Sequence, residues 1–112
     1  MSQTVNFNRH RPPILRVPLS EELVLHVTPP TVDLQDELRA RSGELRALLS
    51  QDDDEMRVAL YDLAARLMSC NRNLRKITAE DLRTTYELDE ADLAVFFEDY
   101  AGYLTQIENA KN

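Results

Sequence analysis

Apolar and polar residues alternate near the start of the chain in a pattern that predicts a β-hairpin over residues 14–28. Two short apolar runs are divided there by the polar residues 20–22, and pairing Leu19 with Leu23 fixes their register. Pro18 lacks a backbone N–H and the turn lacks Gly or Asn, so we expect an edge strand and an irregular turn. The register also pairs Val17 with Leu25 and Leu15 with Val27, and it places on one side the six residues Leu15, Val17, Leu19, Leu23, Leu25 and Val27.

Farther along the chain, apolar residues recur every three or four positions, which is the spacing of amphipathic helices. Thr28-Pro29-Pro30 separates the hairpin from this region, because proline lacks a donor and holds its predecessor extended. Gly43 weakens the middle of the first helix by about 1 kcal/mol relative to Ala, which indicates either a close helix contact or a break. We predict four helices, over about residues 33–49, 54–71, 79–86 and 90–108.

Capping residues mark the starts of the last two helices. Thr78 precedes Asp81 by three positions, and Asp89 precedes Asp92 by the same spacing. Each pair supplies an acceptor side chain for amides that lack a helical partner and a carboxylate near the positive helix end. Both starts are therefore predicted from local sequence.

The predicted fold is α+β and mainly α, with the N-terminal β-hairpin packed on a bundle of about four helices. An isolated hairpin is marginally stable, so its apolar side needs the helices as cover. The length of 112 residues fits one domain. We assign it to residues 13–112 and interpret residues 1–12 as a flexible arm.

The last helix carries the aromatic residues on which a binding hypothesis depends. Phe96 and Tyr100 are predicted to lie in the core. The aromatic residues together span too wide an arc for one buried seam, so Phe97 and Tyr103 are predicted at its margin, where aromatic anchors bind partners. The candidate partner-binding residues are Phe97, Tyr103, Phe96 and Tyr100, and the whole apolar face is Leu93, Phe96, Phe97, Tyr100, Leu104 and Ile107.

Charge narrows the classes of partner. The net charge of −7 argues against general binding to nucleic acid or to anionic membranes, which requires clustered Lys and Arg. Only the N-terminus is locally basic, and we interpret it as a solvated arm. No apolar run approaches the length of a membrane span, and the N-terminus lacks the apolar core of a signal peptide. We therefore expect a cytoplasmic protein that does not bind membranes.

Catalytic, cofactor and metal sites find little support. Cys70 is the only cysteine and both histidines are far from it in sequence, so it is interpreted as a packed or surface thiol. Gly43 and Gly102 are the only glycines, which excludes a glycine-rich phosphate loop. The acidic run 52–55 lacks the ligand spacing of a calcium loop and suits a helix N-terminus. We predict that the chain is not an enzyme and binds neither a cofactor nor a metal. Residues distant in sequence can still converge into a site in the folded chain.

The order of the elements and three motifs resemble the tail assembly chaperones of long-tailed (siphovirus-like) phages and prophages. The resemblance extends from Ile14 to the end of the chain. Its motifs are Val27-Thr-Pro-Pro-Thr-Val32, Lys76-Ile-Thr-Ala-Glu-Asp-Leu82 and Leu88-Asp-Glu-Ala-Asp-Leu-Ala-Val-Phe-Phe-Glu-Asp-Tyr100.

The resemblance implies a non-enzymatic protein of the host cytoplasm that is absent from the mature virion. Such a chaperone binds the tape measure protein, keeps it soluble and helps to load tail tube subunits. In many of these proteins a ribosomal frameshift adds an extension that engages the tube protein, and Ala110-Lys111-Asn112 can be encoded by a message with a slippery adenine run. We also expect a homo-oligomer, formed through the aromatic margin and the hairpin edge.

Two other classes of function stay open at this level. The chain could be a small acidic adaptor or regulatory protein that binds one folded partner through Phe97 and Tyr103. It could also be an acidic mimic of nucleic acid, but its acids cluster at helix caps rather than at phosphate-like spacing.

Overall fold

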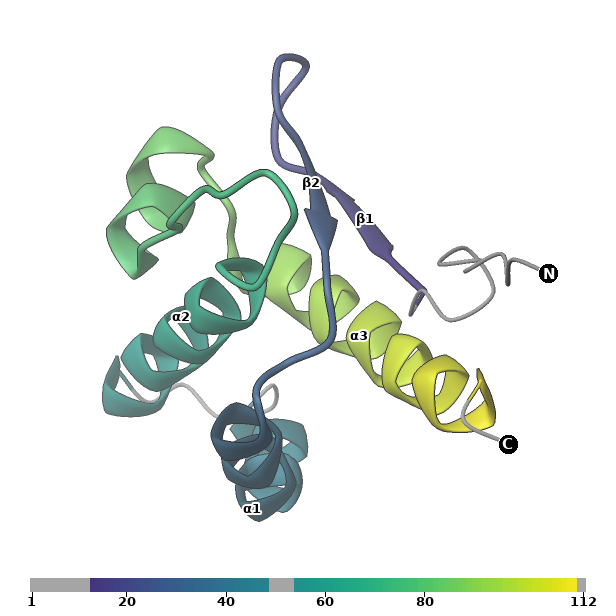
Figure 1. The fold of residues 1–112 in the computed structure, drawn as a ribbon. Helices are drawn as coiled ribbons and strands as arrows, with labels where there is room; N and C mark the ends of the chain where they lie inside the picture. Colours follow the sequence, from purple (N-terminus) through teal and green to yellow (C-terminus); the bar gives the residue numbers. More distant parts are fainter. Residues whose placement is uncertain (1–12, 49–53, 111–112) are drawn as a thin grey trace, which may run out of the picture.

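The computed structural model describes residues 13–48 and 54–110. The predicted arm (residues 1–12), the acids at positions 52 and 53, and Lys111-Asn112 lie outside the described residues. The described part is mainly helical with one N-terminal β-hairpin, which confirms the predicted fold class. Figure 1 shows α2 on the left and α3 on the right, with the hairpin above the start of α3 and α1 below α2.

The hairpin consists of β1 (Leu15–Pro18) and β2 (Val24–Val27) in the predicted register. The side chains of Leu25 and Val27 are buried, whereas Arg16 and His26, which alternate with the apolar residues, are exposed. Ser20 closes the turn, since its hydroxyl accepts a hydrogen bond from the amide of Leu23 at 3.1 Å. The alternation of buried and exposed positions therefore determined the register as predicted.

Pro18 does not cost the ladder a hydrogen bond, although it lacks a backbone N–H. The amide of Leu19 donates to the carbonyl of Leu23 at 3.0 Å. Bonded pairs alternate along an antiparallel ladder, so the next ones involve Val17 and Leu15, and the backbone of Pro18 faces away from β2. Proline is tolerated at such an outward position.

Helix α1 (Val32–Leu48) begins at Thr31, whose hydroxyl accepts a hydrogen bond from the amide of Leu34 at 3.3 Å. It continues without interruption through Gly43, which answers the question that the sequence left open. Leu34 and Leu38 are buried, so the first half of α1 is anchored in the core.

Helix α2 (Asp54–Met68) ends three residues before the predicted boundary, because the chain turns at Ser69 to form a hydrogen-bonded loop. The π-helical turn η2 (Asp81–Thr85) follows, and α3 (Glu90–Ala110) completes the fold. Both predicted caps are present as reciprocal hydrogen bonds of 2.9–3.1 Å, between Thr78 and Asp81 and between Asp89 and Asp92.

The core lies where α2 and α3 cross beneath the apolar side of the hairpin. Tyr61 closes the end of the α2–α3 contact, because its hydroxyl donates to the carbonyl of Leu88 at 2.6 Å. The largest fully buried side chains are Tyr100, Leu25, Leu63, Leu67, Met68, Leu82, Leu93 and Val27.

Candidate partner-binding surfaces

The four aromatic residues proposed for partner binding all lie on α3, but they differ in exposure. Phe96 and Tyr100 are buried, as predicted, and Phe97 is half-buried at the margin of the core. The margin position predicted for Tyr103 is wrong, because its side chain is only 3% exposed. Of the two predicted margin residues, only Phe97 is accessible to a partner in this fold.

The hairpin explains the burial of Tyr103. Its hydroxyl donates to the carbonyl of Pro13 at 2.7 Å and lies 3.2 Å from that of Val27. Burial raises the pKa of Tyr103 to about 12 and also raises that of Tyr100, so both phenols are neutral in the core. Tyr103 is therefore a structural link between the hairpin and α3.

Phe97 belongs to a partly exposed apolar stripe on α3. Ala94, Phe97, Ala101 and Leu104 fall on one side of the helix by their spacing, and none of them is fully buried. The ring of Phe97 packs edge-on against Phe96, with 5.4 Å between the ring centroids. We call these four residues the α3 margin. They form a continuous apolar edge of about three turns that borders the core.

Ion pairs flank the α3 margin at both ends. Glu90, one turn before Ala94, pairs with Arg57 of α2. Glu108, one turn after Leu104, lies 3.9 Å from Arg39 of α1. Such exposed pairs contribute little stability, but they place the margin on the side of α3 that faces the start of α2 and the middle of α1.

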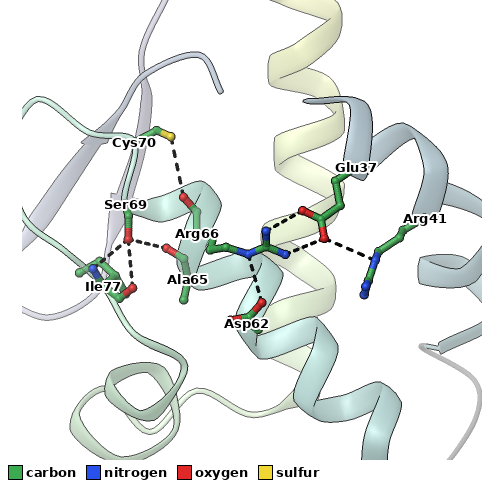
Figure 2. Close-up of polar contacts among 8 residues, drawn as sticks. All are labelled: Glu37, Arg41, Asp62, Ala65, Arg66, Ser69, Cys70 and Ile77. Carbon is green, nitrogen blue, oxygen red and sulfur yellow. Dashed lines mark hydrogen bonds and ion pairs between the residues drawn. The ribbon is translucent and has the colours of Figure 1, made fainter. Parts of the chain in front are cut away.

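A charged network fastens α1 to α2 (Figure 2). The guanidinium of Arg66 donates two hydrogen bonds to the carboxylate of Glu37, at 2.6 and 2.8 Å, and also pairs with Asp62 at 3.1 Å. Arg41 approaches the same carboxylate at 3.7 Å. The hydrogen bonds from Arg66 hold the pKa of Glu37 below its ordinary value and raise the pKa of Arg66. This bidentate pair fixes the angle at which α1 leaves the core.

A second candidate surface is the loop formed by Asn71–Lys76, which we call the 71–76 loop. Ser69 closes its base, because its hydroxyl bonds both the amide and the carbonyl of Ile77, at 2.9 and 3.0 Å. The side-chain amide of Asn71 spans the interior, donating to Met68 and Arg75 carbonyls and accepting from the Arg75 amide. The loop therefore has a defined shape.

The 71–76 loop also closes the outer edge of β2. The carboxamide of Asn73 accepts from the amide of His26 at 2.8 Å and donates to the carbonyl of Val24 at 3.2 Å. The amide of Arg72 donates to the carbonyl of His26 at 2.9 Å. These bonds satisfy the backbone groups that β2 would otherwise present to another strand.

The tip of this loop displays Leu74 to solvent. Its side chain is 94% exposed and its backbone is left-handed, with φ of 56°. A left-handed conformation costs a non-glycine residue about 1–2 kcal/mol. Arg72, Arg75 and Lys76 are exposed beside it, and none of them forms an ion pair within the described part of the chain. The loop thus holds an apolar residue among three cations on an acidic protein.

An open cleft lies between α2 and the chain from Leu74 to Ala79. Its volume is about 620 Å³, and its walls include Ala65, Arg66 and Ile77. Cys70 is half-buried nearby, with its sulfur 3.8 Å from the carbonyl of Arg66, which agrees with the predicted packed or surface thiol.

The 71–76 loop was not predicted from the sequence, which indicated only the end of a helix at about residue 71. The available signal was the pair Asn71 and Asn73 on either side of Arg72, because asparagine side chains often bond neighbouring backbone in loops. An isolated apolar residue among cations was the second signal.

Comparisons with protein-family models, with curated protein sequences and with solved structures found no match to this chain. Across residues 13–48 and 54–110, every helix is too short or too polar to cross a membrane.

Proposed function

We propose that this chain is a tail assembly chaperone that binds the tape measure protein of a long-tailed phage or prophage and keeps it soluble. The three sequence motifs that resemble this family support the proposal. The structural observation that carries it is the α3 margin, an accessible apolar stripe that contains Phe97 and borders a rigid core.

The chemistry of the client fits this stripe. Before the tail tube encloses it, a tape measure protein exposes long apolar helical surface. An apolar edge of about three helical turns can pack along one side of such a helix. The net charge of −7 then keeps the complex in solution, because like-charged particles repel one another.

The proposal includes the cellular role. The chaperone acts in the host cytoplasm without catalysing a reaction, and it is absent from the finished virion. A frameshifted longer form carries an extension that engages the tail tube protein, so that one complex brings client and tube subunits together. Many weak contacts along one extended client give high avidity and still permit release.

Co-expression with the tape measure protein tests client binding. Ala101→Glu places a charge in the middle of the α3 margin, and Ala91→Glu makes the same change at an exposed alanine outside the margin, nearly three turns away and about 80° around the helix from Ala101. Both alanines are exposed, so neither change should unfold the domain. We expect the soluble yield of the client to rise several-fold with the wild-type chain and with Ala91→Glu, but not with Ala101→Glu.

Phe97→Asp extends the same test to the predicted aromatic anchor. It should also abolish client solubilisation, whereas Tyr103→Asp and Phe96→Asp should unfold the domain, because each buries a charge. Circular dichroism separates these two effects. Full solubilisation by both Ala101→Glu and folded Phe97→Asp would refute binding at the margin.

The alternative is a small acidic adaptor that binds one folded partner. In that case a stoichiometric complex with a folded protein would form while the tape measure protein stayed insoluble with every variant. The same co-expression experiment therefore separates the two functions.

A further inference from the structure

The outward face of α3 carries an exposed apolar residue among acids. Val95 is 58% exposed and points away from the core formed by the other side of the helix. Asp92, Glu98 and Asp99 lie three or four positions from Val95, so their side chains surround it, and all three are exposed. We call these four residues the Val95 face.

The Val95 face and the 71–76 loop are complementary in charge, and their residues are arranged in a similar way. Each presents one exposed aliphatic side chain at its centre, Leu74 in the loop and Val95 on the helix. Cations surround the first, and carboxylates surround the second. No ion pair joins the two surfaces within one copy of the described chain.

We propose that the 71–76 loop of one copy binds the Val95 face of a second copy. Leu74 then packs against Val95, while Arg75 and Lys76 meet Glu98 and Asp99. A second copy is the occupant that this structure favours, because both halves of the complementary pair are present on the same chain. The proposal specifies surfaces for the self-association expected from the sequence, and it does not depend on the identity of any client.

The contact joins two different surfaces. A pair of copies joined by one such contact still has one free loop and one free Val95 face, so further copies add head to tail until a ring of two or more copies closes or the chain of copies ends. A loop and one helix face bury less than the approximately 800 Å² per partner of a stable interface. The association is therefore weak and depends on protein concentration.

The rigid loop supports this role. Asn71 and Asn73 hold the loop in one shape before binding, so little conformational freedom is lost when a partner docks. The left-handed backbone of Leu74 costs stability, yet its side chain makes almost no contact within the copy. Contact with a second copy gives that side chain an apolar environment.

A charge-swap experiment on the purified chain tests the proposal. The loop variant combines Arg75→Glu with Lys76→Glu, and the helix variant combines Glu98→Lys with Asp99→Lys. Sedimentation velocity should show wild-type association that rises with concentration and a monomer for each variant alone. An equimolar mixture of the two variants should associate to within about threefold of the wild-type dissociation constant, because each reversed surface then finds its complement.

Total charge cannot account for that result. Reversing two charges shifts the net charge of −7 by four, to −11 for the loop variant and −3 for the helix variant, so the mixture has the wild-type mean. The matched control combines Glu21→Lys with Glu22→Lys in the hairpin turn and also has a net charge of −3. Both proposed surfaces are unchanged in this control, so it should self-associate as well as the wild type, whereas the helix variant of the same net charge should not.

Three outcomes would overturn the proposal: a wild-type chain that stays monomeric up to the highest soluble concentration, a helix variant that self-associates as well as the wild type, or a control that stays monomeric as the helix variant does. Because no client is present, these outcomes leave the co-expression test of chaperone function unaffected.

Discussion

Replacing Leu74 by glycine should stabilise the monomer, although it removes a large apolar side chain. Leu74 adopts a left-handed backbone with φ of 56°, and its 94% exposure means that the substitution removes almost no packing. Glycine avoids the cost of about 1–2 kcal/mol that this backbone imposes on other residues. Glycine also makes the unfolded chain more flexible, which costs about 0.4–1 kcal/mol. The expected net gain is about 1 kcal/mol.

Glu87 provides an independent second case. It is exposed and left-handed, with φ of 52°, where the chain leaves η2, and the amide of Leu88 donates back to the carbonyl of Leu82 at 2.8 Å. Helix ends of this kind usually carry glycine at that position. Glu87→Gly should therefore raise stability by a similar amount, while Arg75→Gly, in the same loop as Leu74 but with an ordinary φ, should lower it.

Urea denaturation and thermal melts measure these changes. A gain of 1 kcal/mol raises the melting temperature of a domain of this size by about 4 °C. Leu74→Gly should at the same time abolish the self-association proposed above. A loss of stability of 1 kcal/mol or more in Leu74→Gly would show that the side chain contributes to the folded monomer, and the reasoning from backbone strain would then be wrong.

Two further substitutions test the loop and the network between α1 and α2. Asn73→Ala removes both side-chain bonds to β2 and should cost about 1–2 kcal/mol in urea denaturation, whereas Arg72→Ala, which keeps its backbone bond, should change stability by less than about 0.5 kcal/mol. Glu37→Gln should lower stability at neutral pH, because Arg66 lowers the pKa of Glu37 in the folded state. That contribution is present above the ordinary pKa of 4.5 and is lost as pH falls through the lowered folded value, so wild-type and variant stabilities should converge in acid. Asp36→Asn, at an exposed neighbour, is the matched control and should change stability at neutral pH by less than about 0.5 kcal/mol.

The hairpin and the helix caps could be predicted because local residues determine them. The alternation of six apolar residues excludes registers shifted by one residue, and the short turn at residues 20–22 selects the register observed between β1 and β2. The reciprocal bonds at Thr78 and Asp89 depend only on residues three positions away.

Tyr103 could not be placed by the same reasoning. Phe97 and Tyr103 flank the buried seam of α3 on opposite sides, and helical spacing treats both sides alike. In the folded chain the hairpin covers the side that carries Tyr103. The burial of Tyr103 therefore depends on a contact with Pro13, 90 residues away in the sequence. The left-handed backbone of Leu74 was unpredictable for a related reason, because bonds from Asn73 to a distant strand help to impose it.

The bond between Tyr103 and Pro13 also bears on how the chain folds while it is being synthesised. The hairpin is synthesised before α3, the helix that covers its apolar side. A two-stranded hairpin is marginal without such cover, so it cannot dock until α3 has followed it out of the ribosome. Nascent chains that stop within α2 should therefore carry an uncovered apolar hairpin, and protection of that hairpin against aggregation begins only when α3 emerges.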